Sequence, residues 1–192
     1  MTVVKRQAER LARQLLRRDQ DRLRHTAGVA ERAAALAGPL GADAELLTAA
    51  AWLHDIGYAP SVAVTGFHPL DGARHLYGLR WPAEIVGLVA QHSGAAIVAA
   101  AEGHAAALAA FPVTDIGLYD ALTYADQTVG PTGERVTWHQ RYDEMMGRHR
   151  PDSANVRVDA LRRPHLAAVA ARVERRLAEA GGVPDGRISE AV

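Results

Sequence analysis

The sequence predicts an all-α protein. Apolar residues recur at helical spacing, as Val4, Ala8, Leu11 and Leu15 do near the N-terminus. The alternation of apolar and polar residues that is typical of strands is nearly missing. Glycine and proline residues separate the periodic segments, where they would end one helix and begin the next.

The first expected helix carries a stripe of arginines, which are Arg6, Arg10, Arg13 and Arg17. Such a stripe could bind an anion. The solvated face of a packed helix is the simpler interpretation, because charged side chains without a specific partner usually point into water.

The other expected helices cover residues 22–37, 43–54, 69–78, 82–92, 95–110 and 115–126, and helices resume near 137 and again over 155–180. Gly38-Pro39 is a common stop signal. Pro69 suits the first turn of a helix, and Asp115 can act as an N-cap. Residues 127–135 are expected to form a loop, because glycine and proline cluster there.

Composition narrows the class of protein. The 192-residue chain has a formal net charge of zero, which gives no argument for a nucleic-acid or membrane partner. The absence of cysteine excludes disulfides and thiolate metal sites and fits a reducing cytoplasm. No apolar run is expected to approach the roughly 20 residues that span a bilayer, and the N-terminal residues lack the apolar region of a signal peptide.

The cationic residues are strongly biased. Lys5 is the only lysine, whereas arginine and alanine abound, a bias typical of a G+C-rich bacterial genome. An anionic substrate would therefore be held by arginine, histidine, backbone amides or metal.

Four residues suggest a metal site. His54 and Asp55 end the apolar helix AELLTAAAWLHDIG, and Gly57 lets the chain turn so that both side chains can approach one cation. His25 lies early in its helix, beside the apolar stripe. Asp126 ends another apolar helix, where a carboxylate opposes the helix dipole and needs a compensating cation. Each of them taken alone is as well explained as a cap or a core residue, so their combination carries the hypothesis.

The order His25, His54-Asp55, Asp126 resembles the HD superfamily of metal-dependent phosphohydrolases. The surrounding segments RHTAGVAERAAALA, LLTAAAWLHDIG and ALTYADQTVGP resemble it too. The similarity covers roughly residues 23–135.

The resemblance implies a helical bundle of the HD-domain type with extra N- and C-terminal helices. We expect the metal-binding domain over residues 21–135, an N-terminal helix over 1–20 and a helical extension over 136–180. Residues 181–192 are expected to be a disordered tail.

Two further histidines match the ligand set of dinuclear relatives. His68 begins HPLDGARHL, and His92 lies in EIVGLVAQHS. Both resemble ligands of HD-GYP phosphodiesterases and of bacterial symmetrical diadenosine tetraphosphate hydrolases. The resemblance implies that Asp55 bridges two metal ions, with His68 and His92 on the second. One or two divalent ions per chain are expected, and imidazole with carboxylate favours Fe, Mn, Co, Ni or Zn over Mg.

The implied reaction is the attack of a metal-activated water on a small-molecule partner. That partner would be a phosphomonoester, a nucleotide or a dinucleoside polyphosphate. Asp55 would be catalytic as well as a ligand, because it would orient the water. Arg24, Arg74 and Arg135 are the predicted substrate-binding residues, since they lie near the ligands in the sequence and arginine binds phosphate bidentately.

The chain departs from its dinuclear relatives at two positions. Ser93 stands where HD-GYP proteins have a second histidine, and their GYP loop is missing, so hydrolysis of cyclic dinucleotides is not expected. Tyr58 stands where many relatives have a lysine, so that phosphate contact is lost or replaced.

Two other functions remain open. Di-iron oxygenases similar to myo-inositol oxygenase use the same ligand order, so the ligands alone do not separate hydrolysis from oxygen activation. The third function is a non-catalytic sensor of metal or nucleotide, although no effector domain is evident. The amphipathic first and last helices could also pair in a homo-oligomer.

Overall fold

The computed structural model describes residues 3–181, and it confirms the all-α prediction. The helices in chain order are α1 (Val3–Leu15), α2 (Gln20–Leu40), α3 (Ala44–Leu53), the 3-10 turn η1 (Ile56–Tyr58), α4 (His68–Gly78), α5 (Ala83–Gln91), the 3-10 turn η2 (His92–Gly94), α6 (Ala95–Glu102), α7 (Ala105–Ala109), α8 (Ile116–Gln127), α9 (Trp138–Arg148), α10 (Ala154–Arg157) and α11 (Asp159–Glu179). Within residues 3–181 the only β-type pairing is one isolated bridge between Val129 and Arg135. Of the expected tail, residues 182–192 lie outside the described residues.

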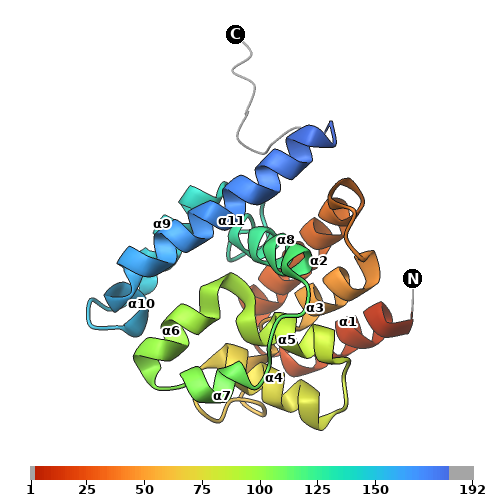
Figure 1. Ribbon diagram of the computed structural model, residues 1–192. Helices are drawn as coiled ribbons and strands as arrows, with labels where there is room; N and C mark the ends of the chain where they lie inside the picture. Colours follow the sequence, from red (N-terminus) through yellow and green to blue (C-terminus); the bar gives the residue numbers. More distant parts are fainter. Residues whose placement is uncertain (1–2, 182–192) are drawn as a thin grey trace.

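The helices form a bundle around α3 and α8. Figure 1 shows α2, α3 and α8 side by side, with α1 on one flank and the long helix α11 on the other, next to α9 and α10. Helix α4 packs on α5 and on η1. Leu53 and Ile56 are fully buried on either side of His54-Asp55. Because burying each such side chain stabilises the fold by roughly 1.5–3 kcal/mol, the core fixes the backbone that carries this dipeptide.

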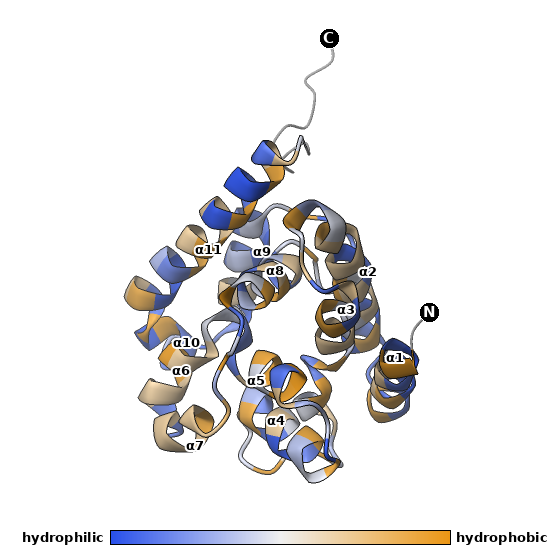
Figure 2. Ribbon diagram, turned by 45° about the vertical axis from the view of Figure 1, so that its right-hand side comes forward, coloured by the Kyte–Doolittle hydropathy of each residue, from blue (hydrophilic) through white to orange (hydrophobic). Residues whose placement is uncertain are grey.

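Helix α1 is a packed, amphipathic helix. Ala8 and Ala12 are fully buried against the bundle, whereas the arginines of the stripe, Arg6, Arg10, Arg13 and Arg17, are exposed. Figure 2 shows apolar and polar positions on different faces of this helix. The exposed arginines fit the solvated-face interpretation.

Two predicted helix ends are wrong. Helix α2 continues through Gly38 and Pro39 to Leu40, because Gly41 takes the left-handed conformation (φ 61°) whose N–H bonds to the carbonyls of Ala37 and Gly38. The single helix expected over 95–110 is interrupted at Gly103, also left-handed (φ 78°), and becomes α6 and α7. In both cases a glycine with positive φ ends the helix.

One segment is apolar enough for a membrane span by length and composition, contrary to expectation. This segment, Ala83–Glu102, runs from α5 through η2 to α6. Its helical geometry is broken at Ser93 (φ 52°, ψ 36°), and 67% of its most apolar window is buried within the protein. It has the features of a core segment.

Candidate metal centre

His54 and Asp55 converge because helix α3 ends between them. His54 keeps helical angles (φ −58°, ψ −33°) as the C-cap of α3, while Asp55 (φ −105°, ψ 5°) leaves the helix and precedes η1. The change in backbone direction turns both side chains toward one group of donor atoms, whereas neighbours inside a helix point about 100° apart.

Three histidines are held by the same kind of contact. The Nδ1 atom lies 3.0 Å from the Gly130 carbonyl oxygen in His25, 2.7 Å from that of Ala51 in His54, and 2.7 Å from that of Val89 in His92. A carbonyl oxygen only accepts, so each Nδ1 carries a proton and each Nε2 is the ring atom left to face a metal ion. Donation of the remaining N–H to a carbonyl is the usual support for a metal-binding histidine.

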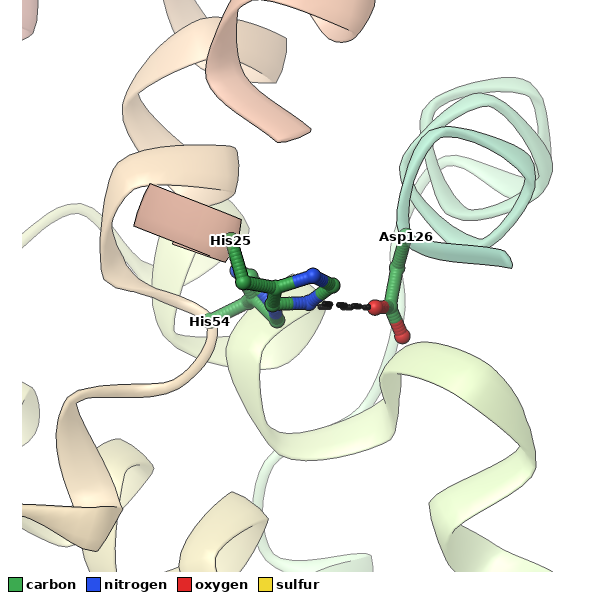
Figure 3. A group of neighbouring side chains, drawn as sticks. All are labelled: His25, His54 and Asp126. Carbon is green, nitrogen blue, oxygen red and sulfur yellow. Dashed lines mark hydrogen bonds and ion pairs between the residues drawn. The ribbon is translucent and has the colours of Figure 1, made fainter. Parts of the chain in front are cut away.

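His25, His54 and Asp126 meet around one point, as Figure 3 shows. Asp126 Oδ1 lies 3.0 Å from His25 Nε2 and 3.8 Å from His54 Nε2. Asp55 Oδ2 lies 3.8 Å from His25 Nε2 and 3.4 Å from His54 Nε2. Two imidazole nitrogens and two carboxylate oxygens therefore face a common centre.

A second group of ligand atoms lies on the other side of Asp55. His68 Nε2 is 3.3 Å from Asp55 Oδ1 and 3.3 Å from His92 Nε2. His54, Asp55 and His92 also offer donor atoms within 4.8 Å of one another. The structure thus brings together all six predicted ligands, and the two oxygens of Asp55 face two different histidine groups.

The chemistry of these atoms fits a divalent cation. His54 Nε2 is buried and has no hydrogen-bond partner among the described residues. Burial alone would raise the pKa of Asp55 and Asp126. His54 and Arg22 nevertheless hold the pKa of Asp55 well below the ordinary range, and the contact with His25, together with His54, does the same for Asp126. Burial likewise opposes protonation of His54, but the carboxylate of Asp55 raises its pKa to about 9. Two buried anions thus stabilise positive charge where a metal would supply it.

The two histidines of the second group suit neutral ligands. Burial lowers the pKa of His68 well below its ordinary value, and it lowers the pKa of His92 as well. A histidine must be deprotonated to bind a metal, so this shift favours the ligand form.

A family model described as HD domain matches residues 22–128 of the chain. The chain belongs to the HD-domain family. The match covers more than half of the 192 residues, lies within the range expected for the metal-binding domain, and contains all six converging side chains. No curated protein and no solved structure matches the chain. Membership of the family, together with the histidine–aspartate cluster, indicates a divalent-metal site.

Five of the six predicted ligands, all except the fully buried His54, line a cavity of about 330 Å³. None of the three predicted substrate-binding arginines lines it: Arg24 is exposed and pairs with Asp21, and Arg74 and Arg135 are exposed. Arg24 stands directly before His25 in the sequence but points elsewhere, because adjacent helical residues diverge. The arginines at the cavity are Arg22, Arg141, Arg148 and Arg162.

Arg22 is the arginine closest to the ligands, and it was missed as a site residue. Its Nη1 donates to Asp55 Oδ2 at 2.7 Å, and its guanidinium lies 4.1 Å from the ring centroid of Tyr58. Tyr58 in turn stacks on His68, with centroids 4.0 Å apart. Tyr58 stands where many relatives have lysine, and its ring packs against the guanidinium of Arg22, which comes from α2. The spacing in the sequence could have predicted this position, since Arg22 lies one turn before His25 on the same helical face.

Ser93 positions Asp126. It adopts the left-handed conformation (φ 52°), and its hydroxyl donates a hydrogen bond to Asp126 Oδ2. Gln127 Nε2 donates to the same oxygen and to Ser93 Oγ, at 3.1 Å each. These bonds occupy Oδ2 and leave Oδ1 for the metal centre. The serine that stands in place of the second histidine of HD-GYP proteins thus holds the predicted ligand Asp126.

Asp71 anchors the loop that leads to His68. Its buried carboxylate accepts hydrogen bonds from the backbone N–H groups of Val64, Thr65 and Gly66, at 2.9 to 3.1 Å, and from the Thr65 hydroxyl at 2.8 Å. Asp71→Asn is expected to lower the free energy of unfolding by about 2 kcal/mol, because bonds to a charged acceptor are lost. Urea unfolding measures the change.

The control for Asp71 is Asp43→Asn. Asp43 accepts two backbone N–H groups as the exposed N-cap of α3, a role that asparagine fills equally well. This variant is expected to unfold at nearly the unsubstituted urea concentration. Equal midpoints for the two variants would contradict the anchoring role of Asp71.

Proposed function

We propose that this HD-domain protein is a phosphohydrolase that binds two divalent metal ions bridged by Asp55. The observation that carries the proposal is the placement of Asp55 between two ligand groups. Its Oδ2 lies 3.4 Å from His54 Nε2, and its Oδ1 lies 3.3 Å from His68 Nε2. A carboxylate with histidine groups on both sides is suited to a two-metal centre, which serves in-line displacement at phosphorus.

The predicted ligands would bind the two ions in two groups. His25, His54 and Asp126 would hold one ion, and His68 and His92 the other. When bound, the ions supply an activated water near neutral pH and neutralise charge on a phosphoryl oxygen.

Asp55 would orient the water through its carboxylate. Arg22 donates a hydrogen bond to the same carboxylate and would also hold a phosphoryl oxygen, as arginine does in many phosphate sites.

The cavity supports a compact anionic substrate. Its volume of about 330 Å³ lies at the lower end of the roughly 300–1,000 Å³ range of ligand pockets, which favours a phosphomonoester or a mononucleotide over a dinucleoside polyphosphate. Four arginines at its wall would serve an anion, whereas a neutral substrate of an oxygenase would leave them unused.

The test combines metal analysis with turnover. The purified protein is expected to contain two divalent ions per chain and to release phosphate with Mn or Co. His54→Ala is expected to lower metal content and to reduce phosphate release more than about 100-fold, since even the groups that support ligands contribute about 10–100-fold. The matched control is His75→Ala, on α4 but outside the cavity, which is expected to keep both.

Other outcomes would replace the proposal. Two irons per chain with oxygen-dependent loss of substrate would identify an oxygenase of the same ligand order. Tight nucleotide binding without any turnover would identify a sensor.

A further inference from the structure

The cavity has a second wall that the HD domain does not supply. Its residues come from α9, α11 and the segment between them, all beyond the matched residues 22–128. Figure 1 shows these helices together along one flank of the bundle. We call Arg141, Arg148 and Arg162 the arginine wall. Five of the six proposed metal ligands line the same cavity, so a bound molecule would meet both groups.

Arg162 is a buried cation with neutral partners. Its side chain donates twice to the Ser93 carbonyl oxygen, at 3.1 and 3.0 Å, and once to Asn155 Oδ1 at 2.8 Å. The residue is 7% exposed, and among residues 3–181 no carboxylate forms an ion pair with it. A buried charge without a counter-ion is unfavourable. An anion in the cavity would supply that counter-ion.

Arg141 and Arg148 share a single carboxylate. Arg141 Nη1 lies 2.6 Å from Glu144 Oε2, and Arg148 Nε lies 2.8 Å from Glu144 Oε1. Arg141 is 5% exposed, and its Nε has no hydrogen-bond partner among the described groups. Glu102 is a further carboxylate at the cavity. The three arginines of the wall therefore have two carboxylates near them, Glu144 and Glu102, and one positive charge remains in excess.

The metal centre and the arginine wall would need separate anions. A phosphoryl group and the activated water would together offset the charge of two divalent ions beside Asp55, Asp126 and Arg22. They leave no anion for the arginine wall. A substrate with one anionic group would leave the wall without a counter-ion, whereas a second anionic group would satisfy it.

We propose that the arginine wall binds a second anionic group, a phosphate or a carboxylate, of the molecule whose phosphoryl group lies at the metal centre. The substrate is then a compact phosphate ester with two anionic ends. The substrate part of this inference rests on the proposed hydrolase function, whereas anion binding by the wall does not.

The binding test uses inorganic phosphate as the probe. Full-length protein is titrated calorimetrically at low salt, both with its metals and after chelation. Arg148→Gln is expected to weaken phosphate binding about tenfold, the equivalent of one charge-assisted hydrogen bond. Arg148 is half exposed, so its loss leaves the core intact, and circular dichroism checks the helices.

Two further variants sharpen the binding test. Arg150→Gln is the matched control, because it removes the same charge two residues from Arg148. The Arg150 side chain is 85% exposed and lies outside the cavity. It is expected to bind phosphate as the unsubstituted protein does. Glu144→Gln is expected to bind phosphate more tightly, because it removes the carboxylate that competes for Arg141 and Arg148. Equal affinity of the Arg148 and Arg150 variants in both forms, or no gain from Glu144→Gln, would overturn the proposal.

The substrate test compares a monophosphate with the bisphosphate of the same carbon skeleton. The bisphosphate is expected to have a kcat/KM about tenfold higher, and Arg148→Gln is expected to abolish that preference through KM. If neither compound is hydrolysed while the phosphate titration succeeds, the hydrolase proposal fails and the anion site stands. If both are hydrolysed equally well, the second anionic group is refuted and the hydrolase stands.

Discussion

Asp55→Asn is expected to remove both metal ions and to lower turnover more than about 1,000-fold, well beyond the roughly 10–100-fold of a residue that only supports a ligand. The substitution keeps the size of the side chain but removes its charge. One carboxylate oxygen becomes an NH₂ group, which faces the histidine nitrogens with its hydrogens and cannot bind a cation. Metal analysis and phosphate release measure the two effects.

The matched control is Asp120→Asn. Asp120 is also buried and also pairs with an arginine, since Arg172 donates to both of its oxygens at 2.8 and 2.7 Å. It lies on α8, the helix of Asp126, but not at the cavity. This variant is expected to lose stability and to keep its metals. If the Asp55 variant retained two ions per chain, Asp55 would not be the bridge.

Gly57→Ala is expected to lower the free energy of unfolding by about 3 kcal/mol or more, at the upper end of the cost of overpacking. A Cβ at this position would lie 2.7 Å from the carbonyl carbon of His68 and closer still to its oxygen. The clash is with backbone, which cannot swing aside as a flexible side chain would. Urea unfolding measures the loss. Because His68 must move, the metal content is expected to fall as well.

Gly78→Ala controls for the added methyl group. Gly78 lies at the end of α4, the helix that His68 begins, and a Cβ there meets nothing within 4 Å. Alanine in a helix is expected to raise stability by roughly 0.5–1 kcal/mol relative to glycine. A Gly57 variant as stable as the Gly78 variant would show that His68 is not held against Gly57.

Gly57 also shows where sequence reasoning found the right residue for an incomplete reason. The dipeptide His54-Asp55 followed by glycine suggested a turn that needs backbone freedom. In the structure Gly57 has no positive φ, and its requirement comes from the close approach of the His68 backbone. That contact joins η1 to α4, and no pattern in the sequence around Gly57 predicts it.

The helix boundaries divide in the same way. Asp43, Asp115 and Thr137 act as N-caps where the sequence predicts helices to begin, because a cap acts on the three residues that follow it. The two ends that were wrong depend on which glycine takes a left-handed conformation. Gly41 and Gly103 do so and Gly38 does not, and the local sequence does not distinguish them.

The sequence by itself determined the all-α class, because helical periodicity is a property of the chain, and its resemblance to HD domains indicated the six side chains that converge. Only the tertiary structure decided which arginines face the cavity. Neighbours on a helix point about 100° apart, so proximity to a ligand in the sequence predicted Arg24, whereas Arg22 lies on the face of His25. Arg141, Arg148 and Arg162 reach the cavity from helices outside the HD domain, and only the packing of α9 and α11 on the bundle brings them there.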